Sequence, residues 1–153
     1  MRKYLPLALA FAVLGCAVAQ DKAPEKAPEK APAPRTLKVK LNYTGAGTVD
    51  EKHKIFLFLF DTPDFTQGNA MPIGFQQAAA KDVTVAFEGL ASSPVFVTAA
   101  YDPSGQYEGM SAPPSGASMG MYSKTPGTPE PIKIEPGETV TVELAFDDSF
   151  KMP

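Results

Sequence analysis

The sequence of 153 residues contains no tryptophan, one cysteine and one histidine. A zinc site usually needs several Cys or His ligands, and a Ser or Cys triad needs a histidine base, so these scarcities argue against both. The histidine, His53, lies between charged residues in "VDEKHK", which is typical of a solvated turn. A Walker loop, a glycine-rich dinucleotide loop and an H-E-x-x-H helix are also missing. We therefore expect a protein that is not an enzyme and has no cofactor.

Disulfides and basic surface are scarce as well. Cys16 is the only cysteine, so the fold must be stabilised by packing alone. Residues 36–153 carry eight lysines and no arginine against fourteen acidic residues, a net charge near −6. This charge disfavours nucleic acid as a partner.

The N-terminus has the pattern of a secretory signal peptide over residues 1–19. Arg2 and Lys3 precede an apolar run at residues 4–14, which is shorter than the ~20 apolar residues that a membrane span needs. Ala-Val-Ala at residues 17–19 predicts cleavage before Gln20. "VLGC" at residues 13–16 resembles the lipobox of bacterial lipoproteins, and this resemblance implies cleavage before Cys16 and acylation of that cysteine. Both alternatives stay open.

Residues 20–35 form a linker that repeats K-A-P-E. A proline every four residues excludes helix and sheet, and nothing in the repeat is large and apolar enough to offset the entropy of ordering it. We expect a disordered tether with a reach on the order of 45 Å when extended. A tether is most useful when one end is fixed, which favours the lipid anchor.

The remaining residues, 36–153, predict one domain built of strands. Leu37, Val39 and Leu41 alternate with polar residues, and "KIFLFLF" is apolar throughout, as in a central strand. The expected strands are 36–43, 54–60, a short one within 71–76, 82–90, 93–101, one around Ile132 and Ile134, and 139–146. A helical turn is expected in "QQAAAK". Gly and Pro turns and the absence of a crossover helix favour an antiparallel β-sandwich of about seven strands, for which an Ig-like arrangement is one alternative.

A family resemblance supports this fold. "VAFEGLASSPVFVTAAYD", with Phe87, Gly89, Leu90 and Phe96, resembles the central hairpin of transthyretin-like, carboxypeptidase-regulatory-type sandwich domains. "PGETVTVELAF" is similar to their closing strand. The resemblance implies an accessory module that binds, spaces or presents other molecules outside the cell, with no catalytic residues.

The segment 102–129 predicts a long loop without secondary structure, a feature that is usually functional or disordered. We expect its aromatic and methionine side chains to supply adaptable apolar contacts to a ligand. These candidate binding residues are Tyr107, Met110, Met119, Met121 and Tyr122. The alternative is that the same side chains fold back and cover the open end of the sandwich.

Two metal sites are weighed as alternatives. Met110, Met119 and Met121 offer thioethers, which select Cu(I). Asp102 and Glu108 in "DPSGQYE" offer carboxylate oxygens for Ca²⁺, although the spacing matches no calcium motif. The simpler interpretation is that Asp102, like Asp61 in "DTPD", bonds to its own backbone in a turn.

The sequence thus predicts a non-catalytic, exported module of the cell envelope that presents the 102–129 loop to a protein or glycan. We expect an anchor in the outer or cytoplasmic membrane through acylated Cys16, facing the periplasm or the cell surface. A soluble periplasmic or secreted protein is the alternative location. A metal-binding periplasmic protein and a structural spacer without a ligand are the alternative functions.

Overall fold

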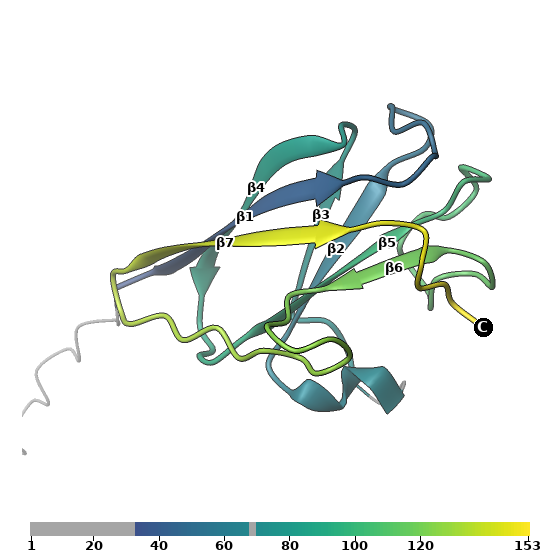
Figure 1. The fold of residues 1–153 in the computed structure, drawn as a ribbon. Coiled ribbons are helices and arrows are strands. Elements are labelled where there is room, and N and C mark those ends of the chain that lie inside the picture. The colour runs from purple at the N-terminus through teal and green to yellow at the C-terminus, as the bar shows by residue number, and fades with distance from the viewer. Residues whose placement is uncertain (1–32, 68–69) are drawn as a thin grey trace, which may run out of the picture. The chain divides into compact units, whose positions relative to one another are not determined.

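The computed structural model describes residues 33–67 and 70–153, which form an all-β domain (Figure 1). The predicted signal peptide, Cys16 and the linker up to residue 32 lie outside the described residues. The strands are β1 (Arg35–Tyr43), β2 (Ile55–Phe60), β3 (Gly74–Ala78), β4 (Asp82–Leu90), β5 (Phe96–Tyr101), β6 (Ser118–Met121) and β7 (Thr139–Phe146), with a 3-10 helix η1 (Pro63–Gln67). The predicted fold class and strand number are confirmed.

The strands form two sheets. A three-stranded sheet has the order β4-β1-β7, and a four-stranded sheet has the order β3-β2-β5-β6 (Figure 1). All pairs are antiparallel except β1 and β7, which run parallel from Thr36↔Thr139 to Tyr43↔Phe146. The expected antiparallel arrangement is therefore wrong at this pair. A parallel pair needs a long connection, and here the rest of the domain between the two strands provides it without a crossover helix.

The core lies between the two sheets and follows the predicted alternation. The inward positions of β1, β2, β5 and β7 are buried: Leu37, Val39, Leu41, Tyr43, Ile55, Leu57, Leu59, Val97, Ala99, Tyr101, Val142, Leu144 and Phe146. Phe87 of β4 joins them, with Val83 and Val85 packed against the cluster. Each fully buried aliphatic or aromatic side chain contributes roughly 1.5–3 kcal/mol relative to an exposed one.

The four-stranded sheet also buries its outer face. Every residue of β2 and β5 is buried. We call the buried outward residues Phe56, Phe58, Phe60, Phe96 and Ala100 the outer cluster. Phe65 of η1 covers one side of it, with its ring centroid 4.7 Å from that of Phe60. The unbroken apolar run of β2 therefore reflects a strand covered on both faces, as predicted for a central strand.

Three local expectations are wrong. β6 lies inside the segment that was expected to be irregular, because its four residues pair with β5 at the edge of the sheet and are too few for a visible alternation. The expected strand around Ile132 and Ile134 is reduced to one bridge, Val95↔Ile132, although both isoleucines are buried. "QQAAAK" contributes Gln76–Ala78 to β3 instead of forming a helical turn, because Gln76 and Ala78 pair with Leu57 and Ile55.

The two ends of the domain have different roles. At one end the chain enters β1, where Ala33 O accepts a hydrogen bond from Gly137 N (3.2 Å) and Arg35 Nε donates to Ile134 O (2.8 Å). At the other, the distal end, the rings of Tyr43 and Tyr101 lie 4.8 Å apart, and Tyr101 Oη donates to Thr48 O. No helix in residues 33–67 and 70–153 is long and apolar enough to cross a membrane.

Candidate functional site

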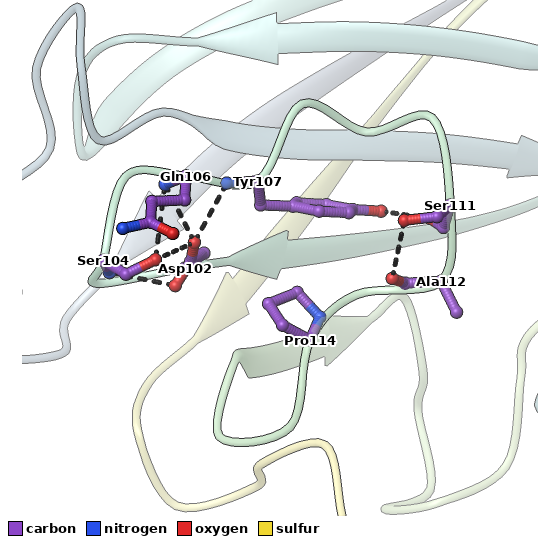
Figure 2. Close-up of a pocket in the computed structure, with 7 residues that line it drawn as sticks. All are labelled: Asp102, Ser104, Gln106, Tyr107, Ser111, Ala112 and Pro114. Atoms are coloured by element: carbon purple, nitrogen blue, oxygen red, sulfur yellow. Dashed lines mark hydrogen bonds between the residues drawn. The ribbon is translucent and has the colours of Figure 1, made fainter.

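The distal loop, which we define as residues 102–117, is organised by a buried carboxylate. Asp102 is 5% exposed and directly follows the last residue of β5. Its Oδ1 accepts a hydrogen bond from Ser104 N (2.9 Å), and its Oδ2 accepts from Gln106 N (3.2 Å) and Tyr107 N (3.0 Å), as Figure 2 shows. The Ser104 hydroxyl also donates to Oδ2. One side chain therefore satisfies three backbone N–H groups of the loop that have no partner in a β-sheet.

The electrostatics of Asp102 agree with this structural role. Burial alone would raise the pKa of its carboxyl group. The hydrogen bonds from Ser104, Gln106 and Tyr107 outweigh burial and hold the pKa below its usual value. Asp102 is therefore charged at neutral pH and is stabilised by donors of its own loop, as in the turn-capping interpretation.

Tyr107 fixes the distal loop to the outer face of the four-stranded sheet. Its ring meets that of Phe56 edge-on, with centroids 4.9 Å apart and an interplanar angle of 69°. Its hydroxyl donates to Ser111 O at 2.6 Å (Figure 2). Burial raises the pKa of the hydroxyl to about 12, so Tyr107 stays neutral. The loop thus packs over the outer cluster through the Tyr107 ring, which is fixed by its contact with Phe56 and by the hydrogen bond of its hydroxyl group.

Gly109 lets the loop approach the sheet closely. Its φ is +79°, and a Cβ atom there would lie 2.5 Å from the Phe75 ring and 3.0 Å from the Phe56 ring. Any other residue at this position would be strained and would clash. The adjacent Phe75 and Met110 are exposed by 38% and 89%, so the loop leaves apolar side chains in contact with solvent beside it.

Two hollows flank Tyr107. The first, of about 200 Å³, is lined by Asp102, Ser104, Gln106, Tyr107, Ser111, Ala112 and Pro114 (Figure 2). The second, of about 350 Å³, is lined by Glu51, Lys52, Lys54, Phe56, Gln77, Gly105, Tyr107 and Glu108. The second hollow combines aromatic carbon with charged and amide groups from β2, β3, the distal loop and the residues before β2.

A hydrogen-bond network closes the distal end between the sheets. The Asp148 carboxylate accepts from Ser118 Oγ (2.6 Å), from Tyr43 Oη (2.6 Å) and from Ala46 N (2.8 Å). These bonds lower the pKa of Asp148 to about 2, with the Ser118 bond as the largest cause. Burial, followed by the bond to Asp148, raises the pKa of Tyr43 to about 12. Because Tyr43 belongs to β1 and Ser118 to β6, Asp148 joins the two sheets.

The predicted ligand-binding residues do not form one site. Tyr107 and Met119 pack against the outer cluster, whereas Tyr122 packs against the core between the sheets. Met121 lies in β6 opposite Thr98, and Met110 is exposed in the distal loop. Tyr107 and Met119 thus cover the outer face of a sheet. The alternative given by the sequence was that they cover the open end of the sandwich.

The predicted metal ligands are also separated. Asp102 lines the first hollow and directs its oxygens at the loop backbone, whereas Glu108 is exposed and lines the second hollow. Among the residues that the structure describes, no group of three or more His, Cys, Asp or Glu is placed to hold a metal ion. His53 lies in a turn where its Nδ1 is 2.9 Å from Asp50 Oδ1, as expected for a turn histidine.

Several residues of the site carry no signal that sequence reasoning could use. Gln77 and Lys54 line the second hollow together because β3 pairs with β2. The sequence pattern of residues 71–81 did not predict this pairing. Asp148 follows β7 and has no motif around it. Comparisons add no further indication: no family model matches the chain, and no curated protein or solved structure shows a significant match.

Proposed function

We propose that the protein is an exported, non-catalytic accessory module of the cell envelope, anchored through Cys16, that presents its distal loop to a protein or glycan. The sandwich is proposed to be of the transthyretin-like type. The observation that carries the proposal is the separation of the two ends of the domain. The chain enters beside Arg35 and Ile134, and the distal loop with both hollows lies where β5 ends and β2 begins.

This arrangement suits a tethered binding module. A tether that enters one end leaves the opposite end free to face outward, and loops on a rigid sheet scaffold are a common place for recognition. Exposed apolar residues, Met110 in the loop and Phe75 beside it, add surface of the kind that interaction sites use.

The anchor is tested by mass spectrometry of the mature chain from membrane and soluble fractions of a bacterial host. We expect a membrane-bound chain that begins at acylated Cys16, and Cys16→Ser should move the protein to the soluble fraction. A wild-type chain that begins at Gln20 and is soluble would remove the anchor from the proposal.

Presentation of the loop is tested by photo-crosslinking in the producing cells. A crosslinking residue replaces Ser111, which is exposed in the distal loop, or Ala91, which is exposed at the opposite end. We expect a discrete adduct from position 111 and none from position 91. Equal labelling from both positions contradicts presentation by the distal end, and the absence of an adduct from either position contradicts a protein partner there.

A further inference from the structure

We propose that the second hollow is a subsite for a neutral, polyhydroxylated ring, the chemistry of an uncharged glycan. This inference rests on the proposed function and names the class of molecule that the distal end recognises.

The charges that line the hollow have both signs. Lys52 and Lys54 are accompanied by Glu51 and Glu108. An anionic ligand drawn to the lysines would also meet both carboxylates, and a cationic ligand would meet both ammonium groups. A neutral ligand avoids this repulsion and can use every group, because ammonium groups donate hydrogen bonds and carboxylates accept them.

Three of the polar side chains that line the hollow lie close together. Lys54 Nζ lies 3.6 Å from Glu51 Oε2 and 3.4 Å from Gln77 Oε1, and the Lys54 side chain is 30% exposed. Gln77, an exposed residue of β3, adds an amide that can both donate and accept. Hydroxyl groups, which also donate and accept, are the natural partners of such a mixed set.

Aromatic carbon forms the remaining wall. Tyr107 and Phe56 line the hollow, and the Tyr107 ring is restrained by Phe56 on one side and by the bond to Ser111 O on the other. A restrained ring can contact the C–H groups of a ligand without losing much side-chain freedom on binding. Sugar rings carry C–H groups and hydroxyls together, so they match a wall of this composition.

Size separates the two hollows. Ligand pockets are usually about 300–1,000 Å³. The second hollow, at about 350 Å³, lies at the lower end of that range, and the first, at about 200 Å³, lies below it. In addition, the Asp102 carboxylate that lines the first hollow already accepts hydrogen bonds from the backbone of the loop.

The test is a titration of the ¹⁵N-labelled mature chain with neutral tetrasaccharides of N-acetylglucosamine, β-1,4-linked glucose and α-1,4-linked glucose, followed by NMR. A sulfated tetrasaccharide serves as the charged comparator. We expect at least one neutral sugar to give saturable shifts in the amides of residues 51–54, 77 and 105–108. The sulfated sugar should bind more weakly.

The chain offers a matched pair of variants, because Gln77 lines the second hollow and Gln106 lines the first. Both are exposed. Gln77→Ala should weaken binding roughly three- to tenfold, the value of one or two hydrogen bonds, whereas Gln106→Ala should leave it unchanged. Equal losses in both variants, no saturable shift with any neutral sugar, or tighter binding of the sulfated sugar would overturn the inference.

The outcomes separate this inference from the proposed function. If no neutral sugar binds while position 111 still gives a crosslinked protein adduct, the glycan subsite is wrong and the binding module stands. If position 111 gives no adduct and no sugar binds, both proposals fall.

Discussion

The two sheets of the domain treat their outer faces in opposite ways. The outward residues of β1 and β7 are polar or small and mostly exposed, among them Lys38, Lys40, Thr141 and Glu143. The outward positions of β2 and β5 carry the outer cluster, which is aromatic and buried. A sheet can leave one face in water when the side chains on that face are polar. The three-stranded sheet needs no cover, whereas the four-stranded sheet does.

Irregular segments and the edge strand β6 cover the outer face of the four-stranded sheet, with Met119 of β6 packed against the outer cluster. Phe65 comes from a single turn of 3-10 helix and Tyr107 from the distal loop. Irregular backbone placed against a sheet must satisfy its own polar groups, and the Asp102 carboxylate does this for the distal loop. Because this outer face is apolar, the distal loop packs on it through Tyr107. The loop in turn places polar groups and the two hollows at one end of the fold.

The largest change in the free energy of unfolding is expected at Phe58, which is 7% exposed and belongs to the outer cluster. Phe58→Ala should lower the free energy of unfolding by about 3–5 kcal/mol, because it opens a cavity beneath the cover. Lys40→Ala, on the bare face of β1, should change it by less than about 0.5 kcal/mol. Urea unfolding measures both. Similar losses would mean that the two outer faces do not differ energetically.

The second effect concerns the cover itself. Asp102→Ala removes the acceptor for three backbone donors and one hydroxyl, and we expect a loss of about 2–3 kcal/mol. Asp50 makes a similar set of bonds to Lys52 N and His53 N in an exposed turn that does not belong to the outer cluster. Asp50→Ala should therefore cost less. Hydrogen exchange of the Gln106 and Tyr107 amides should rise in Asp102→Ala alone, and protection that persists would contradict the role of Asp102.

The third effect tests the link between the sheets. Asp148 has a folded-state pKa of about 2 against an ordinary value of 3.8, so its contribution to stability is present above about pH 4 and is lost as the pH falls through 2. Asp148→Asn should lower the free energy of unfolding by about 1–2 kcal/mol at pH 6, and the difference from wild type should shrink as the pH falls from 4 to 2.

Asp147 is the matched control for this pH dependence. It is exposed and bonds only within its own turn, to Ser149. Asp147→Asn should show a smaller change with pH in the same urea experiment. A constant difference between wild type and Asp148→Asn from pH 6 to pH 2 would show that the carboxylate charge does not link the sheets.

The regular part of this fold could be predicted from local pattern. β1 and β7 show a period of two, and β7 was predicted with its observed bounds, since each inward side chain is apolar and its neighbours are polar or, at Ala145, small. β2 could be predicted to be central for a different reason, because its short run is apolar at every position. What pattern could not give was the parallel pairing of β1 with β7, because it depends on residues about one hundred positions apart.

The candidate site was less predictable. Tyr107 was identified as a distinctive residue of the loop, but its contact with Phe56 depends on a sheet face that sequence alone did not show to be in need of cover. Gln77 and Lys54 reach the second hollow only through the pairing of β3 with β2. Asp148 works through Tyr43 and Ser118, which are 105 and 30 residues away. Such long-range contacts leave no local signal.

The smallest expected change in the free energy of unfolding distinguishes a methionine that covers the outer cluster from a methionine that is exposed in the distal loop. Met110 is 89% exposed and Met119 is packed against the outer cluster, yet both were predicted as binding residues on the same grounds. Met119→Ser should lower the free energy of unfolding by about 1–2 kcal/mol, since it removes half-buried apolar surface. Met110→Ser should change it by less than about 0.5 kcal/mol. If Met110→Ser instead destabilises as much as Met119→Ser, the distal loop is a lid along its whole length, and the surface beside Phe75 is not available to a partner.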